Sequence, residues 1–349
     1  MRVLHVDSGR EYRGGQDQVR LLARELARIP DVEQRLVTRR SGELARRAAA
    51  EGITVREVVW TAGLDPRAWW RLVVEALAWP PDLIHAHNAH AVTLAVWARR
   101  FLRHVGAEPR VVATRRVVFR VRAASALRSV DAVIAVSQAV KTGLVAEGLA
   151  SREIAVIPDG VDPVEIRAAA TPLHVRARLA LADTTQLAAN IAALEPSKDQ
   201  ATLVRAAHAA RSLKPDLHWV VAGAGPSRPE LEREIRRLDV ADRVHLLGHV
   251  DQADALIGEC DVLVMSSREE GLGSVVLHAL ALGKPVVATA AGGLPEIVPP
   301  RWLAPVGDAG ALARLVLDAL DHPSPFPLPP QCTASAMAAG VLALYRSLV

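Results

Sequence analysis

The sequence predicts an α/β protein made of two doubly wound parallel-sheet domains in tandem. Short apolar runs typical of buried strands alternate with helical patterns along most of the chain. The chain has 349 residues, of which 50% are hydrophobic, and this is more than one ordinary core accommodates. The strand patterns also fall into two sets, separated near Pro158, Gly160 and Pro163, where the periodicity is interrupted.

The first set of apolar runs predicts strands at residues 2–6, 33–38, 54–60, 82–87, 110–116, 132–137 and 154–158. The second set predicts strands at residues 186–194, 217–223, 243–248, 261–267, 284–289 and 302–306. We therefore expect one domain at residues 1–165 and a second at 166–325. Residues 326–349 follow as a linker and a helix that packs back across the domains. Because open sheets bind ligands at the carboxyl ends of their strands, we expect the two domains to face each other across a ligand cleft.

Composition narrows the classes of protein to consider. The N-terminus lacks the pattern of a signal peptide, and no run reaches the ~18 uncharged apolar residues of a membrane span. Cys260 and Cys332 are too few for a disulfide framework and lack metal-ligand spacing. We therefore expect a cytoplasmic protein. Arginine dominates the 42 basic residues, which indicates either a compositional bias or an anionic partner other than nucleic acid.

Two glycine-rich turns lie between a predicted strand and a helix. Gly14 and Gly15 open the first helix, and Gly223 and Gly225 form the matching turn in the second domain. Such turns bring backbone N–H groups close to an anion, although close helix–strand packing explains double glycines equally well. Lys198 stands at the same predicted sheet edge, where an ammonium group can pair with a phosphate.

The most informative segment is "DVLVMSSREEGLGSVVLHALALGKPVVAT", which predicts a strand, an acidic glycine-rich turn, a helix and another strand. Its turn places backbone N–H groups at a helix N-terminus, where they can donate to sugar or diphosphate oxygens. Carboxylates beside that site are natural acceptors for sugar hydroxyls. The residues concerned are Glu270, Gly271, Leu272, Gly273 and Ser274.

Taken together, these motifs resemble those of the retaining GT-B glycosyltransferases of the large bacterial family 4 type. That group includes lipopolysaccharide-core and phosphatidylinositol mannosyltransferases. The resemblance spans residues 1 to about 320 and rests on the order of "RGGQ", "DLIHAHNAH", "AVIAVSQAV", "VIPDGVD", "AGAGPSRPELE", "LLGHV" and "SSREEGLGSVVLHALALGKPVVATAAGGLPEIV". It implies two Rossmann-like domains, and a nucleotide-diphosphate sugar that serves as co-substrate and binds mainly to the second domain.

The resemblance also implies roles for individual residues. The Gly14–Gly15 turn approaches the donor phosphates and the acceptor, Lys198 pairs with the diphosphate, and Glu270 contacts the donor sugar. The chain departs from the family pattern at Ala193, where an arginine is usual, at Arg116, where a histidine is usual, and at His278, where a second glutamate is usual. We expect Arg116 to help neutralise the phosphates.

Two histidines complete the expected site. His278 lies one helical turn after Ser274, so we expect it to replace one ribose contact made by the family's glutamate. His87 ends a predicted strand and either is a satisfied structural residue or touches the acceptor. No Asp-x-Asp motif and no metal-ligand spacing occurs, so no metal is expected.

Other functions and partners remain open. A nucleotide-sugar 2-epimerase shares the fold that the resemblance implies, and a non-catalytic sugar-nucleotide binder is a third possibility. Trp69, Trp70 and Trp79 stand near Arg67 and Arg71, and residues 110–129 are rich in arginine. These residues form either a solvated face with core tryptophans or a face that meets an anionic, lipid-linked acceptor at the inner membrane surface.

Overall fold

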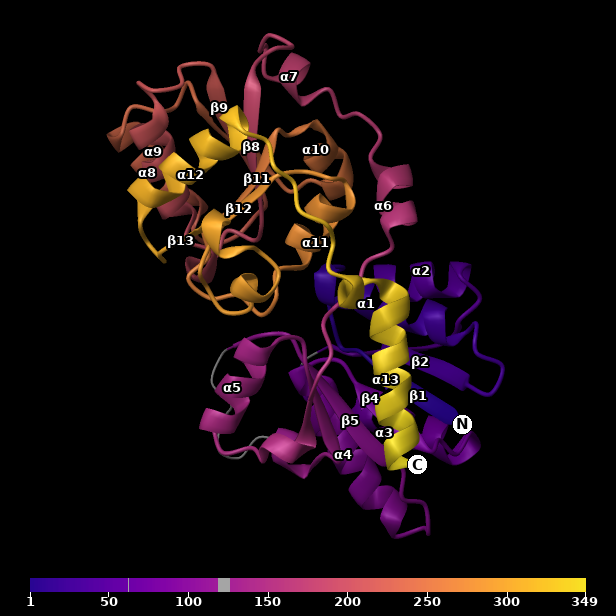
Figure 1. Cartoon of the computed structure of the whole chain (residues 1–349). Helices are drawn as coiled ribbons and strands as arrows, with labels where there is room; N and C mark the ends of the chain where they lie inside the picture. Colours follow the sequence, from indigo (N-terminus) through magenta and orange to yellow (C-terminus); the bar gives the residue numbers. More distant parts are fainter. Residues whose placement is uncertain (62, 119–125) are drawn as a thin grey trace. The chain divides into compact units, whose positions relative to one another are not determined.

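The computed structural model describes residues 1–61, 63–118 and 126–349 (Figure 1). The chain divides into two compact units, one formed by Met1–Gly160 with Pro330–Val349 and the other by Val161–Pro329. Each unit is built on its own parallel sheet, as predicted. Within the described residues, no helix has both the length and the apolar character needed to cross a membrane.

The sheet of the first unit has the strand order β3-β2-β1-β4-β5-β6-β7. All neighbouring strands run parallel, and the strand order reverses beside β1. The strands are β1 (Arg2–Val6), β2 (Glu33–Arg39), β3 (Thr54–Val58), β4 (Leu83–Ala86), β5 (Arg110–Arg115), β6 (Ala132–Ala135) and β7 (Ile154–Val156). The helices are α1 (Gly14–Leu26), α2 (Glu43–Ala50), α3 (Pro66–Ala78), α4 (Ala89–Arg103), α5 (Gln138–Ala146) and α13 (Ala334–Leu348).

The sheet of the second unit has the strand order β10-β9-β8-β11-β12-β13 and is also parallel throughout. Its strands are β8 (Gln186–Ile191), β9 (Leu217–Ala222), β10 (Val244–Gly248), β11 (Val262–Met265), β12 (Val286–Thr289) and β13 (Leu303–Ala304). Its helices are α6 (Pro163–Ala169), α7 (Val175–Arg178), α8 (Gln200–Ala210), α9 (Arg228–Arg237), α10 (Ala253–Glu259), α11 (Ser274–Ala281) and α12 (Ala309–Asp321). Short 3₁₀ turns complete the described chain at Ala126–Ser129, Ser151–Glu153, Pro196–Lys198, Leu294–Glu296, Pro300–Trp302 and Pro330–Cys332.

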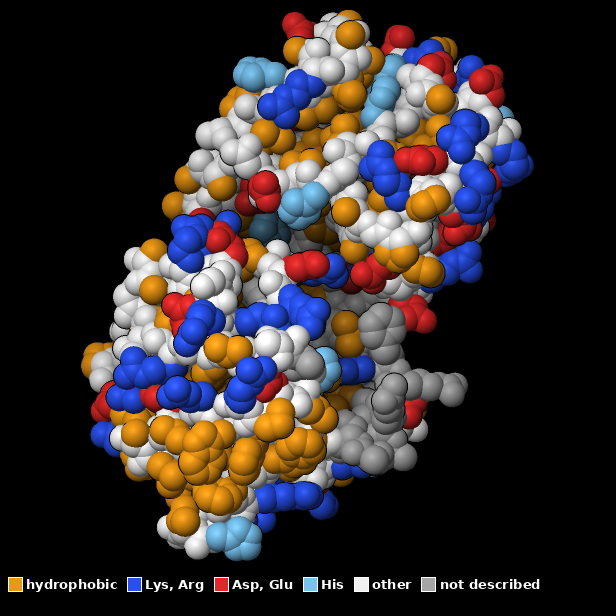
Figure 2. Space-filling view, turned by 180° about the vertical axis from the view of Figure 1, so that it is seen from behind, with side chains coloured by type: hydrophobic (Ala, Val, Ile, Leu, Met, Phe, Trp, Pro, Cys, Tyr) orange, Lys and Arg blue, Asp and Glu red, His pale blue; other side chains and the backbone are white. Residues whose placement is uncertain are grey.

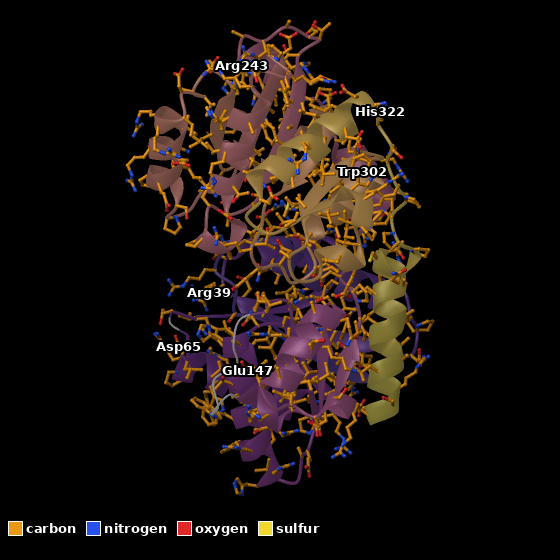
Figure 3. All side chains as sticks on the ribbon, turned by 60° about the vertical axis from the view of Figure 1, so that its left-hand side comes forward. Arg39, Asp65, Glu147, Arg243, Trp302 and His322 are labelled. Carbon is orange, nitrogen blue, oxygen red and sulfur yellow. The ribbon has the colours of Figure 1, made fainter. Side chains whose placement is uncertain are left out.

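Helix starts are fixed by side-chain caps that the sequence supplies. Asp65, labelled in Figure 3, accepts a hydrogen bond from the backbone N–H of Arg67 at 3.0 Å and so caps α3, which begins at Pro66. Asn88 caps α4 in the same way through the N–H of Ala91. Such caps satisfy donors that a helix end leaves free.

The last helix belongs to the core of the first unit. Figure 1 shows α13, in yellow, beside the strands of that unit, and α13 packs against α1. Its buried residues join one apolar cluster with side chains from the sheet and α1, including Leu22, Leu26, Leu83, Met337, Val341 and Tyr345. The hydroxyl of Tyr345 lies 2.6 Å from Nδ1 of His85 on β4. The first unit therefore contains the start and the last helix of the described chain.

Candidate active site

In the second unit, the structure brings Lys198 and Glu270 together across 72 residues of sequence. Nζ of Lys198 lies 2.7 Å from Oε2 of Glu270, and these side chains are 21% and 12% exposed. The hydroxyl of Ser267 donates to the same carboxylate oxygen at 3.3 Å. The turn that ends in Lys198 and the acidic loop after β11 are also joined by a hydrogen bond from the N–H of Arg268 to the carbonyl of Ser197.

Backbone contacts hold the acidic loop in place. The carbonyl of Glu270 accepts from the N–H of Gly293 at 3.1 Å. Gly292 has a φ of 51°, and a Cβ atom there would lie 1.8 Å from the same carbonyl oxygen. Only glycine fits this approach. The carboxylate of Glu270 is therefore fixed on one side by the packing of its own backbone and on the other by Lys198.

The start of α11 presents the backbone donors that the sequence indicates. Gly273 is the N-cap of α11, with a φ of 93° and no side-chain cap. Within the described chain, no acceptor is found for the N–H groups of Leu272, Gly273 and Ser274. These N–H groups and Lys198 can neutralise an anion, and the Glu270 carboxylate can accept hydrogen bonds from hydroxyl groups.

The glycine turn after β9 is explained by packing. A Cβ atom at Gly223, where φ is 149°, would lie 1.9 Å from the carbonyl oxygen of Ala192, and one at Gly225 would lie 2.3 Å from that of Leu194. Each glycine thus permits the backbone after β9 to approach the segment after β8. Close packing, which the sequence left open as the alternative to anion binding, therefore accounts for both Gly223 and Gly225.

His278 has a partner that the sequence did not reveal. Its Nδ1 lies 2.6 Å from Oδ1 of Asp254 on α10, and the two side chains are 23% and 20% exposed. Helical spacing predicts that Val275, Val276 and Leu280 face the core, and of these Val276 and Leu280 are buried while Val275 is only partly buried. When Asp254 accepts from Nδ1–H, the tautomer of a neutral imidazole is fixed and Nε2 remains an acceptor.

In the first unit, Arg116 lies directly after β5 and close to the glycine turn that opens α1. Its Nε donates to Oδ1 of Asp159 at 2.9 Å, and both side chains are largely buried. A Cβ atom added to Gly15 would contact only the Arg116 side chain, at 4.0 Å. Gly14 and Gly15 are the first two residues of α1. The structure therefore brings Gly15, Arg116 and Asp159 together at the carboxyl edge of this sheet.

Asp7, which follows β1, belongs to the same edge. Its carboxylate accepts from the N–H of Gly9 at 2.7 Å and from Nδ2 of Asn88 at 2.9 Å. Burial raises the pKa of Asp7, while these hydrogen bonds and the charge of Arg116 act in the opposite direction. Asp7 and Asp159 were not among the predicted site residues, although a carboxylate directly after a buried strand, as in "HVDSG", is a usable signal of a polar sheet edge.

His87 is buried within a group of three histidines. Its Nε2 lies 3.1 Å from Nδ1 of His5, and His85 contacts both the Tyr345 hydroxyl and, at 2.7 Å, Oγ1 of Thr114. Burial lowers the pKa of His5 to about 4 and those of His85 and His87 well below the usual value. Their ring nitrogens lie within 4.8 Å of one another, a spacing that metal ions can bridge. Because both nitrogens of His85 already have partners, we interpret the group as a neutral network that anchors α13.

Comparison with known proteins gives two family matches along the chain. Residues 12–165 match the family described as Glycosyltransferase Family 4, and residues 174–337 match Glycosyl transferases group 1. A GDP-mannose-dependent monoacylated alpha-(1-6)-phosphatidylinositol monomannoside mannosyltransferase from Corynebacterium glutamicum is 34% identical over 183 residues, which are 48% of this chain and 47% of that protein. The chain spans about half the length of the curated relatives it matches.

Solved structures resemble the chain over its whole length. HepE from Anabaena, in complex with UDP and glucose, aligns with a TM-score of 0.77 and 22% identity, covering 99% of this chain and 95% of HepE. A UDP-GlcNAc 2-epimerase from Neisseria meningitidis, bound to UDP-GlcNAc, aligns with a TM-score of 0.65 and 12% identity, covering 99% of this chain and 100% of the epimerase. At these identities the likeness concerns the fold.

Proposed function

Since its two halves match glycosyltransferase families over residues 12–165 and 174–337, this chain belongs to the GT-B glycosyltransferases of the family 4 type, and we propose that it transfers a sugar from a nucleotide-diphosphate donor to a cell-envelope glycan or lipid-linked acceptor. The relatives suggest the donor class, since one is named as GDP-mannose-dependent and another was solved with UDP and glucose. The binding and transfer experiments described below identify the nucleotide base, the sugar and the acceptor.

The observation that carries this proposal is the Lys198–Glu270 pair beside the N–H groups of Leu272, Gly273 and Ser274 at the start of α11, which find no acceptor among the described residues. A nucleotide-diphosphate sugar offers two kinds of group, a doubly charged diphosphate and a ring of hydroxyls. The ammonium group and the helix N-terminus fit the diphosphate, and the carboxylate fits the hydroxyls. When the donor binds, Lys198 exchanges part of its contact with Glu270 for a contact with the phosphate oxygens.

We propose that transfer retains the anomeric configuration, by analogy with the family. The bond between the acceptor oxygen and the anomeric carbon forms on the face from which the diphosphate leaves, and the acceptor proton passes to the departing phosphate. Lys198 and the amides of Leu272, Gly273 and Ser274 stabilise the charge that develops on the leaving group, and Glu270 positions the sugar. These groups supply the charge stabilisation without a cofactor or metal ion.

The first unit is proposed to contact the acceptor and the phosphate side of the donor. Arg116, with Asp159 fixing its Nε, and the Gly14–Gly15 turn provide a cation and backbone donors at one sheet edge. His87 is only 5% exposed and lies in the buried histidine network. The proposal therefore assigns most of the contact with the acceptor to Arg116 and the Gly14–Gly15 turn, and little of it to His87.

The proposal is tested first by ligand binding. The Tm of the chain is measured with each member of a panel of nucleoside diphosphates and their sugars. Only the nucleotides that carry the base of the true donor should raise the Tm, because binding to the folded state adds stability by mass action. The matching nucleotide sugar is then incubated with the chain and a panel of glycan and lipid-linked acceptors, and transfer is followed by nucleotide release and mass spectrometry. A nucleotide that stabilises the chain without any release of free nucleotide would indicate a non-catalytic binder.

The epimerase alternative is separated by leaving out the acceptor. Incubation of the chain with UDP-GlcNAc alone should leave the sugar unchanged, since a transferase needs an acceptor. Conversion to the 2-epimer would contradict the proposed transfer reaction.

A further inference from the structure

Helices α3 and α4 present a continuous exposed apolar face in the first unit. Figure 2 shows hydrophobic side chains gathered on this side of the molecule, with basic side chains at the border. Trp70 is 50% exposed and Trp97 is 42% exposed. We name this face the α3–α4 surface, and its exposed hydrophobic residues are Leu64, Trp70, Val74, Leu77, Trp97 and Val105.

Aromatic rings pack across the two helices that form the α3–α4 surface. The Phe101 ring of α4 makes edge contacts with Trp69 and Trp70 of α3, with ring centroids 5.8 and 6.2 Å apart. Trp70, Val74 and Leu77 follow helical spacing, so they share one outward stripe of α3. Monomeric proteins seldom leave such a contiguous apolar patch exposed without a partner for it.

Basic residues surround this surface, and carboxylates on the two helices are few and already paired. The sequence of α4 contains no acidic residue. Glu75, the one acidic residue of α3, is engaged by Arg35 at 2.5 Å and by Arg56 at 3.2 Å. Among the described residues, Arg71 and Arg100 have no carboxylate partner. An anionic partner is therefore favoured.

We propose that the α3–α4 surface docks the protein on a membrane that contains anionic lipids. Tryptophan side chains settle at the boundary between acyl chains and headgroups, while arginines beside them attract anionic headgroups. A second copy of the chain suits this surface less well, because a symmetric interface places the same patch on both sides, and the helices of that patch offer no unpaired carboxylate to Arg71 and Arg100. The surface is independent of the donor residues under the proposed function, so the two hypotheses can fail separately.

One tryptophan of the sequence-based interpretation does not belong to this surface. Trp79 is 7% exposed and is enclosed by the guanidinium groups of Arg2 and Arg35, at 5.7 and 4.6 Å from its ring. It is a core residue. Within the arginine-rich stretch, residues 119–125 lie outside the described residues and take no part in the argument.

The test is co-sedimentation of the full chain with vesicles of phosphatidylcholine, with and without phosphatidylglycerol. We expect binding to the mixed vesicles only, and binding that weakens as salt is added. The double variant Arg71→Glu/Arg100→Glu should bind roughly thirtyfold more weakly or worse, as the loss of two basic contacts implies. Its matched control is Arg233→Glu, an exposed arginine on α9 of the second unit, which should leave vesicle binding unchanged.

The apolar part is tested with Trp70→Glu/Trp97→Glu and, as a milder pair, Trp70→Ala/Trp97→Ala. Both should lose vesicle binding, whereas Leu213→Glu, at a residue that is 70% exposed in the second unit, should not. Circular dichroism and nucleotide binding verify that each variant is folded. Equal binding to both vesicle types, no binding to either, or full binding by a folded tryptophan variant would overturn the proposal. So would a stable dimer that these substitutions disrupt and that vesicles do not dissociate.

Discussion

Replacement of Lys198 by alanine should reduce both stability and catalysis, and a second substitution separates the two effects. In the folded state Lys198→Ala leaves the Glu270 carboxylate, which is 12% exposed, without its cation at 2.7 Å. Breaking a fully buried pair costs about 3–5 kcal/mol, and an exposed pair contributes about 0–1 kcal/mol. Because both side chains here are mostly but not fully buried, we expect a loss of about 1–3 kcal/mol.

The corresponding fall in Tm is roughly 2–12 °C, because 1 kcal/mol shifts a domain of this size by about 2–4 °C. The double variant Lys198→Ala/Glu270→Gln removes the unpaired charge and should recover most of that loss. Activity should behave differently. The kcat/KM of Lys198→Ala should fall ~10²-fold or more, and the double variant should stay as low, because the contact with the leaving diphosphate is missing in both.

Differential scanning fluorimetry and steady-state transfer assays on the wild type, both single variants and the double variant measure these quantities. A double variant that recovers activity along with stability would show that Lys198 acts only by holding Glu270. Unchanged kinetics in Lys198→Ala would refute its assignment to the diphosphate.

Three further predictions concern the contact of His278 with the ribose, the independence of transfer from metal ions, and the buried histidines. His278→Ala should weaken nucleoside diphosphate binding by ~0.5–1.5 kcal/mol, the net value of one hydrogen bond. In calorimetry, the 2′,3′-dideoxy nucleotide should bind the wild type more weakly but should show no further loss with the variant. Equal losses for the wild type and the variant on removal of the hydroxyls would contradict the ribose contact. Transfer should survive excess EDTA, and complete loss restored by Mg²⁺ would show that the phosphate site was misread. The free energy of unfolding should fall as the pH drops from about 6.5 toward 4, because unfolding lets His5, His85 and His87 bind protons that their lowered pKa values exclude in the folded state. Each histidine contributes at most ~1.4 kcal/mol per pH unit to the slope of the unfolding free energy against pH. Urea midpoints measured across this pH range should give a smaller slope for His5→Gln. The control His249→Gln, whose side chain is exposed, should give an unchanged slope.

The fold could be predicted from the sequence because it depends on periodicity that is visible locally. Each apolar run coincides with a strand, and even β13, the shortest, lies inside the predicted run at residues 302–306. Helical spacing alone predicted the burial of Val276 and Leu280 on α11, whereas Val275, which it placed on the same side, is only partly buried. These features concern neighbours in sequence, so one segment is enough to reveal them.

Contacts between distant segments could not be predicted in the same way. The sequence placed Lys198 and Glu270 at one sheet edge, but the 2.7 Å contact depends on how two loops fold against each other. Asp254, which engages His278, stands 24 residues earlier on another helix and carries no signal of its own. Asp159 lies in the stretch that we interpreted as a domain boundary, and its pairing with Arg116 depends on the loop after β7 returning to the edge of β5.

The place of α13 has a consequence for the order in which the chain matures during translation. N-terminal domains generally fold first as they leave the ribosome. In this chain, the core of the first unit needs Met337, Val341 and Tyr345, which are synthesised only after residues 161–329 have been made. The second unit can therefore complete its core while the first unit still lacks one helix, and until that helix arrives the nascent first unit exposes the apolar surface that Leu22 and Leu26 of α1 contribute to it.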